Sequence, residues 1–348
     1  MSKMNFFLFI FFIFILLLLA WAFLNFANTK KIFYDDSICS DGSLKDTCSV
    51  RKPYFCSNGF LIEKSKTCGC PENFTIEGDS CISEFQTEPK NAALKYVLRG
   101  KEYEINYTVY RGMADYLSEL PVFIKYDNNE FPSRVDFKLK NINEESQRNF
   151  LLPLVNEIQN RAYDKEEQAR IAISIVQNIP WGFANKTTVF RGTELDYSRH
   201  PYEVLYDSEG VCGEKSELLA FLLREIGYGT VIFYNQEENH ESVGVKCPVE
   251  ESWRNSGYCF VETSGPAIMT DNSLEYVGGF ILQSEPEILF ISDGDSLPAD
   301  IYEYEDARTF KEIKETINGD NFFVGLKKLF YFKKLQEKYG LVEKYNAG

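Results

Sequence analysis

The chain has 348 residues, of which 44% are hydrophobic and 26% charged, a composition that suits a globular protein with one sizeable core and a smaller module. It carries 37 Lys and Arg against 52 Asp and Glu, which gives a formal net charge of −15. This acidic balance argues against binding to nucleic acid or to anionic lipid, because both attract basic proteins, and it identifies no substrate.

The first predicted element is an N-terminal membrane helix. Residues 6–24 form an uninterrupted apolar run, FFLFIFFIFILLLLAWAFL. At a rise of about 1.5 Å per residue this run spans a hydrocarbon core roughly 30 Å thick, so we expect a transmembrane anchor within residues 1–31 and a lipid bilayer around it. A cleavable signal peptide is the alternative, because Ala20-Trp21-Ala22 resembles a cleavage site, but its apolar region is normally only about 7–15 residues long.

The charges that flank this run do not orient it, because Lys3 and the amino terminus are balanced by Lys30 and Lys31. The dense cysteines that follow favour an oxidising compartment. Three glycosylation sequons agree with that compartment, at Asn73, Asn106 and Asn185. We therefore expect a single-pass membrane protein whose main body is extracytoplasmic.

Residues 32–82 form a predicted disulfide module. Six of the nine cysteines lie here, at Cys39, Cys48, Cys56, Cys68, Cys70 and Cys81. The segment has few large aliphatic residues, so it needs disulfides, which typically contribute about 2–4 kcal/mol each. A metal site is the alternative, but the segment lacks histidine and paired C-x-x-C spacing. The connectivity stays open. The runs around Cys39, Cys56 and Cys68 resemble a cysteine-rich module found next to the membrane in archaeal surface proteins, which implies a spacer or binding module.

The rest of the chain is predicted to be an α+β domain. A polar linker at residues 83–95 precedes it, and the domain itself covers residues 96–348. Helices are expected at 147–162, 164–179, 212–227 and 320–339, and strands at 101–110, 230–234, 241–246, 258–262, 280–282 and 288–291. Helices followed by consecutive strands favour an antiparallel sheet. The last helix has a basic face and either packs on the domain or lies on a membrane.

Cys247 and Cys259 flank a short loop that contains Pro248, Asn255 and Gly257. We expect them to lie opposite each other on neighbouring strands and to form a hairpin disulfide worth roughly 3 kcal/mol. Two unrelated reduced thiols are the alternative.

Cys212 is the one cysteine without an obvious partner, since the other eight can pair among themselves. It lies in Gly210-Val211-Cys212-Gly213, at the start of an apolar helix. A helix N-terminus favours the nucleophilic thiolate through its positive dipole and its unpaired amide donors, and the same donors can stabilise an oxyanion. Cys212 is therefore the candidate nucleophile, with a small buried core residue as the alternative.

A cysteine nucleophile needs a base, and the chain has only two histidines, His200 and His240. His240 opens an extended run, so a strand beside the cysteine helix can hold its ring, whereas His200 lies in the loop before that helix. We therefore prefer His240. Glu262, at the end of a following strand, can accept the other imidazole N–H and orient the ring, although an exposed surface glutamate is the commoner fate of such a residue.

Residues 168–266 resemble the transglutaminase-like superfamily of papain-like thiol enzymes, especially its archaeal membrane-anchored members. The segments that carry the resemblance are 169–181 (ARIAISIVQNIPW), 201–223 (PYEVLYDSEGVCGEKSELLAFLL), the strand that begins at His240, and Val261-Glu262-Thr263. The resemblance implies a papain-like, transglutaminase-type core at about residues 165–266.

The resemblance also implies a catalytic triad in which Cys212 is the nucleophile, His240 the general base and acid, and Glu262 the orienting acid. Two positions depart from the family pattern. The acid is usually aspartate, whereas Glu262 is one methylene longer, and the tryptophan often found two residues after the histidine is Ser242 here. These departures put the triad geometry in question. Trp181 falls where family members carry a group that helps the oxyanion site.

The functional hypothesis is a membrane-anchored, extracytoplasmic cysteine peptidase, amidase or acyltransferase that acts on amide bonds through a Cys212 thioester. It takes a protein or peptide substrate and needs no metal or organic cofactor, and hydrolysis is slightly favoured over transamidation. A catalytically inactive surface binding protein is the alternative. A disulfide oxidoreductase is disfavoured, because no second cysteine stands at C-x-x-C spacing from Cys212.

Overall fold

A computed structural model describes residues 37–121, 123–126, 131–190, 192–273, 275–276, 280–316 and 322–341. The expected membrane helix at residues 6–24, and the whole of the segment 1–31, lie outside these ranges. Within them, no helix combines the length and the apolar character needed to span a bilayer.

The cysteine-rich segment folds into small elements tied together by disulfides. These are β1 (Tyr54–Ser57), β2 (Phe60–Glu63), α2 (Ser65–Cys68), β3 (Thr75–Glu77) and β4 (Ser80–Ile82). The disulfides are Cys39–Cys56, Cys48–Cys68 and Cys70–Cys81. Its core consists of only two disulfide cysteines with Tyr54 and Leu61, so the cross-links replace the apolar burial that the sequence lacks. The disulfide interpretation is confirmed, with the connectivity that the sequence left open.

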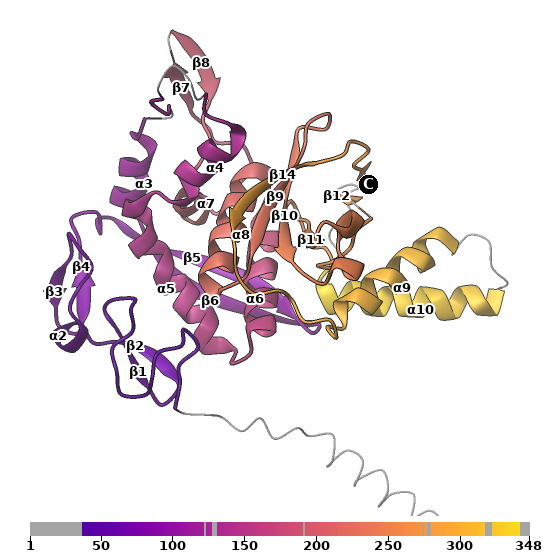
Figure 1. Ribbon diagram of the computed structural model, residues 1–348, viewed down its shortest axis with the longest axis horizontal. Coiled ribbons are helices and arrows are strands. Elements are labelled where there is room, and N and C mark those ends of the chain that lie inside the picture. The colour runs from indigo at the N-terminus through magenta and orange to yellow at the C-terminus, as the bar shows by residue number, and fades with distance from the viewer. Residues whose placement is uncertain are drawn as a thin grey trace, which may run out of the picture.

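This module contacts the main domain through polar groups that lie far apart in the sequence. The guanidinium of Arg51 donates to Gln159 at 2.8 Å and also donates to the main-chain carbonyl of Glu225, the next-to-last residue of helix α8 (Cys212–Ile226). Asn160 bonds both the backbone N–H and the carbonyl of Leu61, each at 3.0 Å. Both amide side chains come from α5 (Glu145–Arg161), beside which the module lies in Figure 1.

The main domain begins with a long antiparallel ribbon, β5 (Pro89–Leu98) and β6 (Lys101–Tyr110). The strand expected at 101–110 is confirmed. Residues 89–95, expected in a linker, belong to β5 instead, because Ala92, Leu94 and Tyr96 alternate inward onto the core. The ribbon packs against α6 (Lys165–Asn178).

Four helices pack against α8, whose middle turns are buried. They are α4 (Arg134–Ile142), α5, α6 and α7 (Pro201–Asp207), and α3 (Arg111–Ser118) packs against α7. The six residues from Leu218 to Leu223 on α8 are each 0% exposed, as expected for a continuous apolar run that covers every side of the helix there. It ends at Gly227, whose φ of 113° is the left-handed conformation that glycine adopts at a helix C-terminus.

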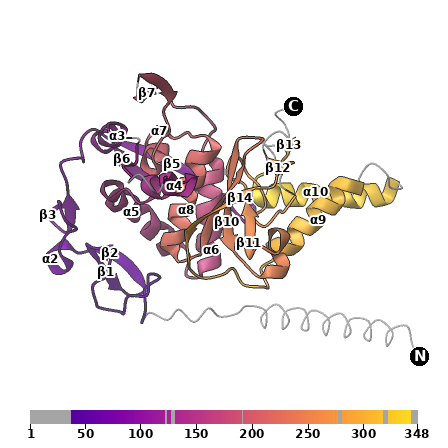
Figure 2. The same cartoon turned by 45° about the horizontal axis from the view of Figure 1, so that its top comes forward.

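A four-stranded sheet covers one side of α8, as Figure 2 shows. Its order is β11 (Tyr258–Val261), β10 (His240–Lys246), β9 (Thr230–Asn235) and β14 (Glu287–Ser292), and every pairing is antiparallel. Val243 and Val245 face the main core, whereas Phe233 and Phe260 belong to a second apolar cluster that also contains Trp253. The prediction of a mixed α and antiparallel β fold is confirmed.

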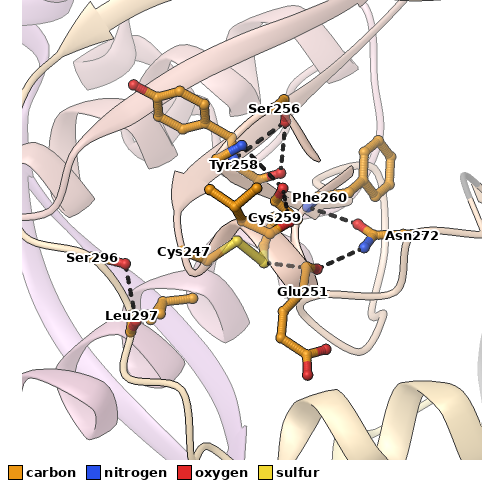
Figure 3. The surroundings of a disulfide bond; sticks show 12 residues. Cys247, Glu251, Ser256, Tyr258, Cys259, Phe260, Asn272, Ser296 and Leu297 are labelled. Carbon is orange, nitrogen blue, oxygen red and sulfur yellow. Dashed lines mark hydrogen bonds between the residues drawn. A yellow bond between two sulfur atoms is a disulfide. The ribbon is translucent and has the colours of Figure 1, made fainter. Parts of the chain in front are cut away.

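The disulfide Cys247–Cys259 closes the β10–β11 hairpin (Figure 3). Cys247 directly follows β10, and Cys259 lies on β11 opposite Val245. The loop that it closes holds two short 3-10 turns, Val249–Glu251 and Trp253–Asn255. The expected hairpin disulfide is confirmed.

The remaining elements are peripheral. Two short ribbons pair β7 (Thr187–Phe190) with β8 (Thr193–Asp196) and β12 (Glu275–Tyr276) with β13 (Phe280–Ile281). The helices α9 (Glu303–Thr316) and α10 (Phe322–Tyr339) form a hairpin that projects from the domain in Figure 1. On α10, Leu335 is buried and Phe332 stacks on Phe310 with ring centroids 4.9 Å apart, so the expected C-terminal helix is a packed one.

Removing the hairpin disulfide with Cys247→Ala and Cys259→Ala together is expected to lower the free energy of unfolding by about 3 kcal/mol, because the cross-link no longer restricts a short loop of the unfolded chain. Urea unfolding followed by tryptophan fluorescence measures this change. Cys212→Ala serves as the matched control that removes a thiol but no cross-link. Equal stability of the double variant and this control contradicts a stabilising role for the disulfide.

Candidate active site

The thiol of Cys212 lies at the first residue of α8, where a buried helix emerges. Its side chain is partly exposed, and the other eight cysteines form the four disulfides, so Cys212 is the free thiol of the chain. The first amides of a helix have no carbonyl partners within the helix, and they point along the axis toward a group at its N-terminus. The position therefore combines access for a substrate with backbone donors for an oxyanion.

The ring of His240 lies between the thiol and a carboxylate. His240 is the first residue of β10, its backbone pairs with Asn235 on β9, and its side chain is buried. Its Nε2 lies 3.0 Å from a carboxylate oxygen of Glu262, and its ring also hydrogen-bonds to Cys212. Since Nε2 is used by Glu262, Nδ1 is the ring nitrogen available to the thiol.

Glu262 follows β11 and is 1% exposed. One of its oxygens, Oε2, accepts from His240, and the other, Oε1, accepts from the backbone N–H of Thr263 at 2.9 Å and of Ser264 at 2.7 Å. The hydroxyl of Ser264 donates to the same Oε1 at 2.6 Å. This turn uses the extra methylene of glutamate to reach the imidazole, so the longer acid still contacts the ring.

The charges of these groups reinforce one another. Burial alone disfavours the imidazolium, but hydrogen bonds to Cys212 and Glu262, together with their negative charge, raise the pKa of His240 to about 10. Burial likewise disfavours the Glu262 carboxylate, and its bonds to His240 and Ser264 outweigh that effect and lower its pKa. At neutral pH the site therefore holds an imidazolium between two acidic groups.

A buried ion pair that the sequence did not reveal holds the segment before Cys212. Arg199, 1% exposed, donates from its backbone to Glu214 Oε1 at 2.8 Å and from its guanidinium to Glu214 Oε2 at 3.1 Å. Glu214 Oε2 also accepts from the backbone N–H of Val211 at 3.0 Å. In the sequence, the only sign of this ion pair is Glu214, an acid three residues after Val211, which is a helix-capping position. Nothing in the sequence around Arg199 indicates the pair, because the fold brings its partners together.

The other histidine is part of a helix cap. The backbone N–H of His200 donates to Glu203 Oε2 at 2.9 Å, and its Nδ1 lies 3.1 Å from the same oxygen. His200 therefore belongs to the start of α7, and among the described residues its hydrogen bonds are made to Glu203.

Trp181 lies on a segment that runs beside the loop leading to Cys212. The backbone N–H of Gly210 donates to Pro180 at 3.1 Å, and the N–H of Gly182 donates to Gly210 at 3.4 Å. The Trp181 ring is 55% exposed and meets Phe183 edge to face, with centroids 4.7 Å apart. Its expected help to the oxyanion site stays a prediction.

A partly exposed cysteine at a helix N-terminus, a buried histidine and a buried carboxylate, joined in series on a mixed α and antiparallel β scaffold, define a candidate thiol site for acyl transfer. No family model and no curated protein matches the chain. Among solved structures, calcium-bound LapG of Legionella pneumophila is similar at 14% sequence identity and a TM-score of 0.24, over 50% of this chain and 97% of LapG. A likeness at this level carries no inference about fold or activity.

Glu262→Gln is expected to lower the pKa of His240 from its value of about 10. Loss of the carboxylate charge removes one of the two neighbours that favour the imidazolium, and such a charge is typically worth about 1–3 pKa units. Proton NMR titration of the two histidine ring signals measures the effect, with the signals assigned through His200→Gln. The matched control is Glu203→Gln, which removes the carboxylate beside His200. If the pKa of His240 is the same in the Glu262→Gln variant as in the wild type, the electrostatic coupling between His240 and Glu262 is contradicted.

Proposed function

We propose that this protein is a transglutaminase-like thiol enzyme that cleaves or transfers amide bonds, with a protein or peptide as substrate. The observation that carries the proposal is the contact series from Cys212 through His240 to Glu262, in which the ring bonds to both neighbours. In this arrangement the imidazole exchanges a proton with the thiol, and the carboxylate keeps the ring oriented and favours its charged form.

In the first half-reaction the Cys212 sulfur, having given its proton to His240, attacks the carbonyl carbon of the amide. The carbonyl π electrons move to oxygen, and amide donors at the start of α8, including the N–H of Cys212, stabilise the oxyanion. The intermediate then expels the amine, which takes the proton from the imidazolium, and a thioester on Cys212 remains. Glu262 stays ionised throughout because its pKa is lowered.

In the second half-reaction, now-neutral His240 removes a proton from an incoming nucleophile that attacks the thioester. Water gives a carboxylic acid, and a second amine gives a new amide. In both cases the thiolate leaves and the imidazolium–thiolate pair is restored. We favour hydrolysis of a peptide, with transamidation as the other outcome of the same intermediate. No step requires a metal or an organic cofactor.

Cys212→Ala is expected to abolish covalent labelling of the full chain by an acyloxymethyl-ketone peptide probe, and His240→Ala to slow it by about 100-fold or more, because the base is lost. Intact mass and peptide mapping measure the labelling. The wild-type rate of iodoacetamide alkylation should already be high below about pH 7, whereas an ordinary thiol reacts near its free pKa of about 8.5. If His240→Ala leaves the labelling rate unchanged and alkylation follows the pH profile of a free thiol, the enzyme proposal is contradicted and a surface binding protein is supported.

The products of the reaction distinguish hydrolysis of the thioester from transamidation. Wild-type protein is incubated with an acyl-donor peptide mixture with and without an excess of a primary amine, and the products are identified by mass. Carboxylic acid products in both reactions support a peptidase, and amine-coupled products support an acyltransferase.

We also propose that the catalytic body is extracytoplasmic and tethered to a membrane by residues 6–24. Four disulfides in the described body favour an oxidising compartment. The apolar run has the length that a bilayer requires.

The full chain is expected to stay with the membrane fraction after alkaline carbonate extraction, and a variant without residues 1–31 to be released, because the apolar run is then absent. Protease protection in sealed vesicles reports on which side the body lies. Release of the full chain, or protection of the body on the cytoplasmic side, contradicts this part of the proposal.

A further inference from the structure

Lys215 is a buried cation one helical turn after Cys212, the proposed nucleophile. It lies three residues after Cys212 on α8, so the two side chains share a face of the helix. It is 0% exposed, and its Nζ donates to the main-chain carbonyl of Ile179 at 2.6 Å. Ile179 follows the last residue of α6, so this ammonium satisfies a carbonyl at the negative end of that helix.

Other cations with little solvent exposure in the described domain contact carboxylates. The side chain of Lys138 is 14% exposed and bonds Glu217 at 2.8 Å and Glu241 at 2.7 Å. The guanidinium of Arg199 forms its pairs with Asp207, Glu209 and Glu214. Lys215 forms no ion pair with any residue that the structure describes. An ammonium buried without a carboxylate in contact is costly, so its presence calls for another source of negative charge nearby.

The negative groups that face Lys215 belong to the candidate active site. Glu262 faces it from the end of β11 and Cys212 from its own helix, and both favour its charged form. Its Nζ donates to the Ile179 carbonyl at the end of α6, and His240 on β10 is bonded to Glu262. Burial lowers the pKa of Lys215 to about 8, while Glu262 and Cys212 limit the decrease, so at neutral pH it is mostly charged.

We propose that Lys215 is a positioning residue of this site, whose buried ammonium supplies a second positive charge that favours the thiolate of Cys212. The inference rests on the proposed function. With His240 charged, the site contains two cations and two acidic groups. Without Lys215, the imidazolium alone faces both the thiolate and Glu262, and the thiol keeps its proton to a higher pH.

The lowered pKa of Lys215 also implies a cost in folding stability. The unfolded chain holds the Lys215 proton up to about pH 10.5 and the folded chain only to about pH 8, so the folded state gains stability as the pH rises between these values. Below that range a neutral side chain of similar length is expected to stabilise the fold. Lys215 would thus favour reactivity at the expense of stability.

The test compares three variants of the full chain with the wild type. Lys215→Met removes the charge and the donor, Lys215→Gln removes the charge but keeps a donor, and Lys215→Arg keeps both. Lys165→Met is the control, because Lys165 is half exposed and pairs with Asp295 outside the site. The readouts are the rate of iodoacetamide alkylation of Cys212 across the pH range and the melting temperature.

We expect Lys215→Met and Lys215→Gln to move the alkylation profile to higher pH by about one unit, which is about tenfold in rate on its rising limb. Lys215→Arg should lie near the wild type, and Lys215→Met should melt at a higher temperature below about pH 8. If Lys215→Met does not fold, the Gln and Arg variants still separate charge from hydrogen bonding.

An unchanged profile in the Met and Gln variants overturns the inference, as does a Gln variant that restores wild-type reactivity. The readout is ionisation of the thiol and not turnover, so it is independent of the substrate. If the His240→Ala variant has the same alkylation profile as the wild type, the proposed function is contradicted. If the Lys215→Met variant has the same profile as the wild type, this inference alone is contradicted.

Discussion

The burial of the middle turns of α8 is the constraint on which the rest of the structure depends. A helix whose residues 214–223 are all buried cannot rotate or slide without disrupting the core, so its first residue has a fixed position. Leu218 and Phe221 are both 0% exposed, and the sheet covers the helix on one side. The helix comes toward the surface at its two ends, and the residue at its N-terminal end is Cys212. The same packing that stabilises the domain therefore fixes the direction of the thiol.

Charge balance around that helix start is the second constraint. The pair of Arg199 with Glu214 ties the preceding loop to the first turn, and the contact of His240 with Glu262 ties two strands of the sheet to the thiol. Each buried charge of these two pairs has a partner that compensates for its loss of hydration. Lys215 differs, because the negative groups that favour its charged form, Glu262 and Cys212, are the groups that the proposed chemistry uses. Stability and reactivity are thus set by the same few electrostatic contacts.

The sequence was informative where local pattern decides structure. The apolar helix after Cys212 and the strand at 101–110 were predictable from periodicity, and the Cys247–Cys259 bond from a short turn between two extended runs. His240 was preferred because a strand holds its ring, and the structure brings that ring to Glu262. The contacts of Arg199 and the burial of Lys215 were not predictable, since a charged side chain next to polar residues usually indicates surface. Their partners come from other segments of the chain and meet them only in the folded domain.

The cysteine-rich module extends the argument to the other end of α8. Its Arg51 donates to the Glu225 carbonyl, so a cation sits where the helix dipole is negative, while the thiol sits where the dipole is positive. Two further hydrogen bonds between Asn160 and the Leu61 backbone fix the orientation of the module on α5. A flexible spacer would make no such specific contacts with the domain. The module is therefore better understood as a cap on the helix that begins at Cys212.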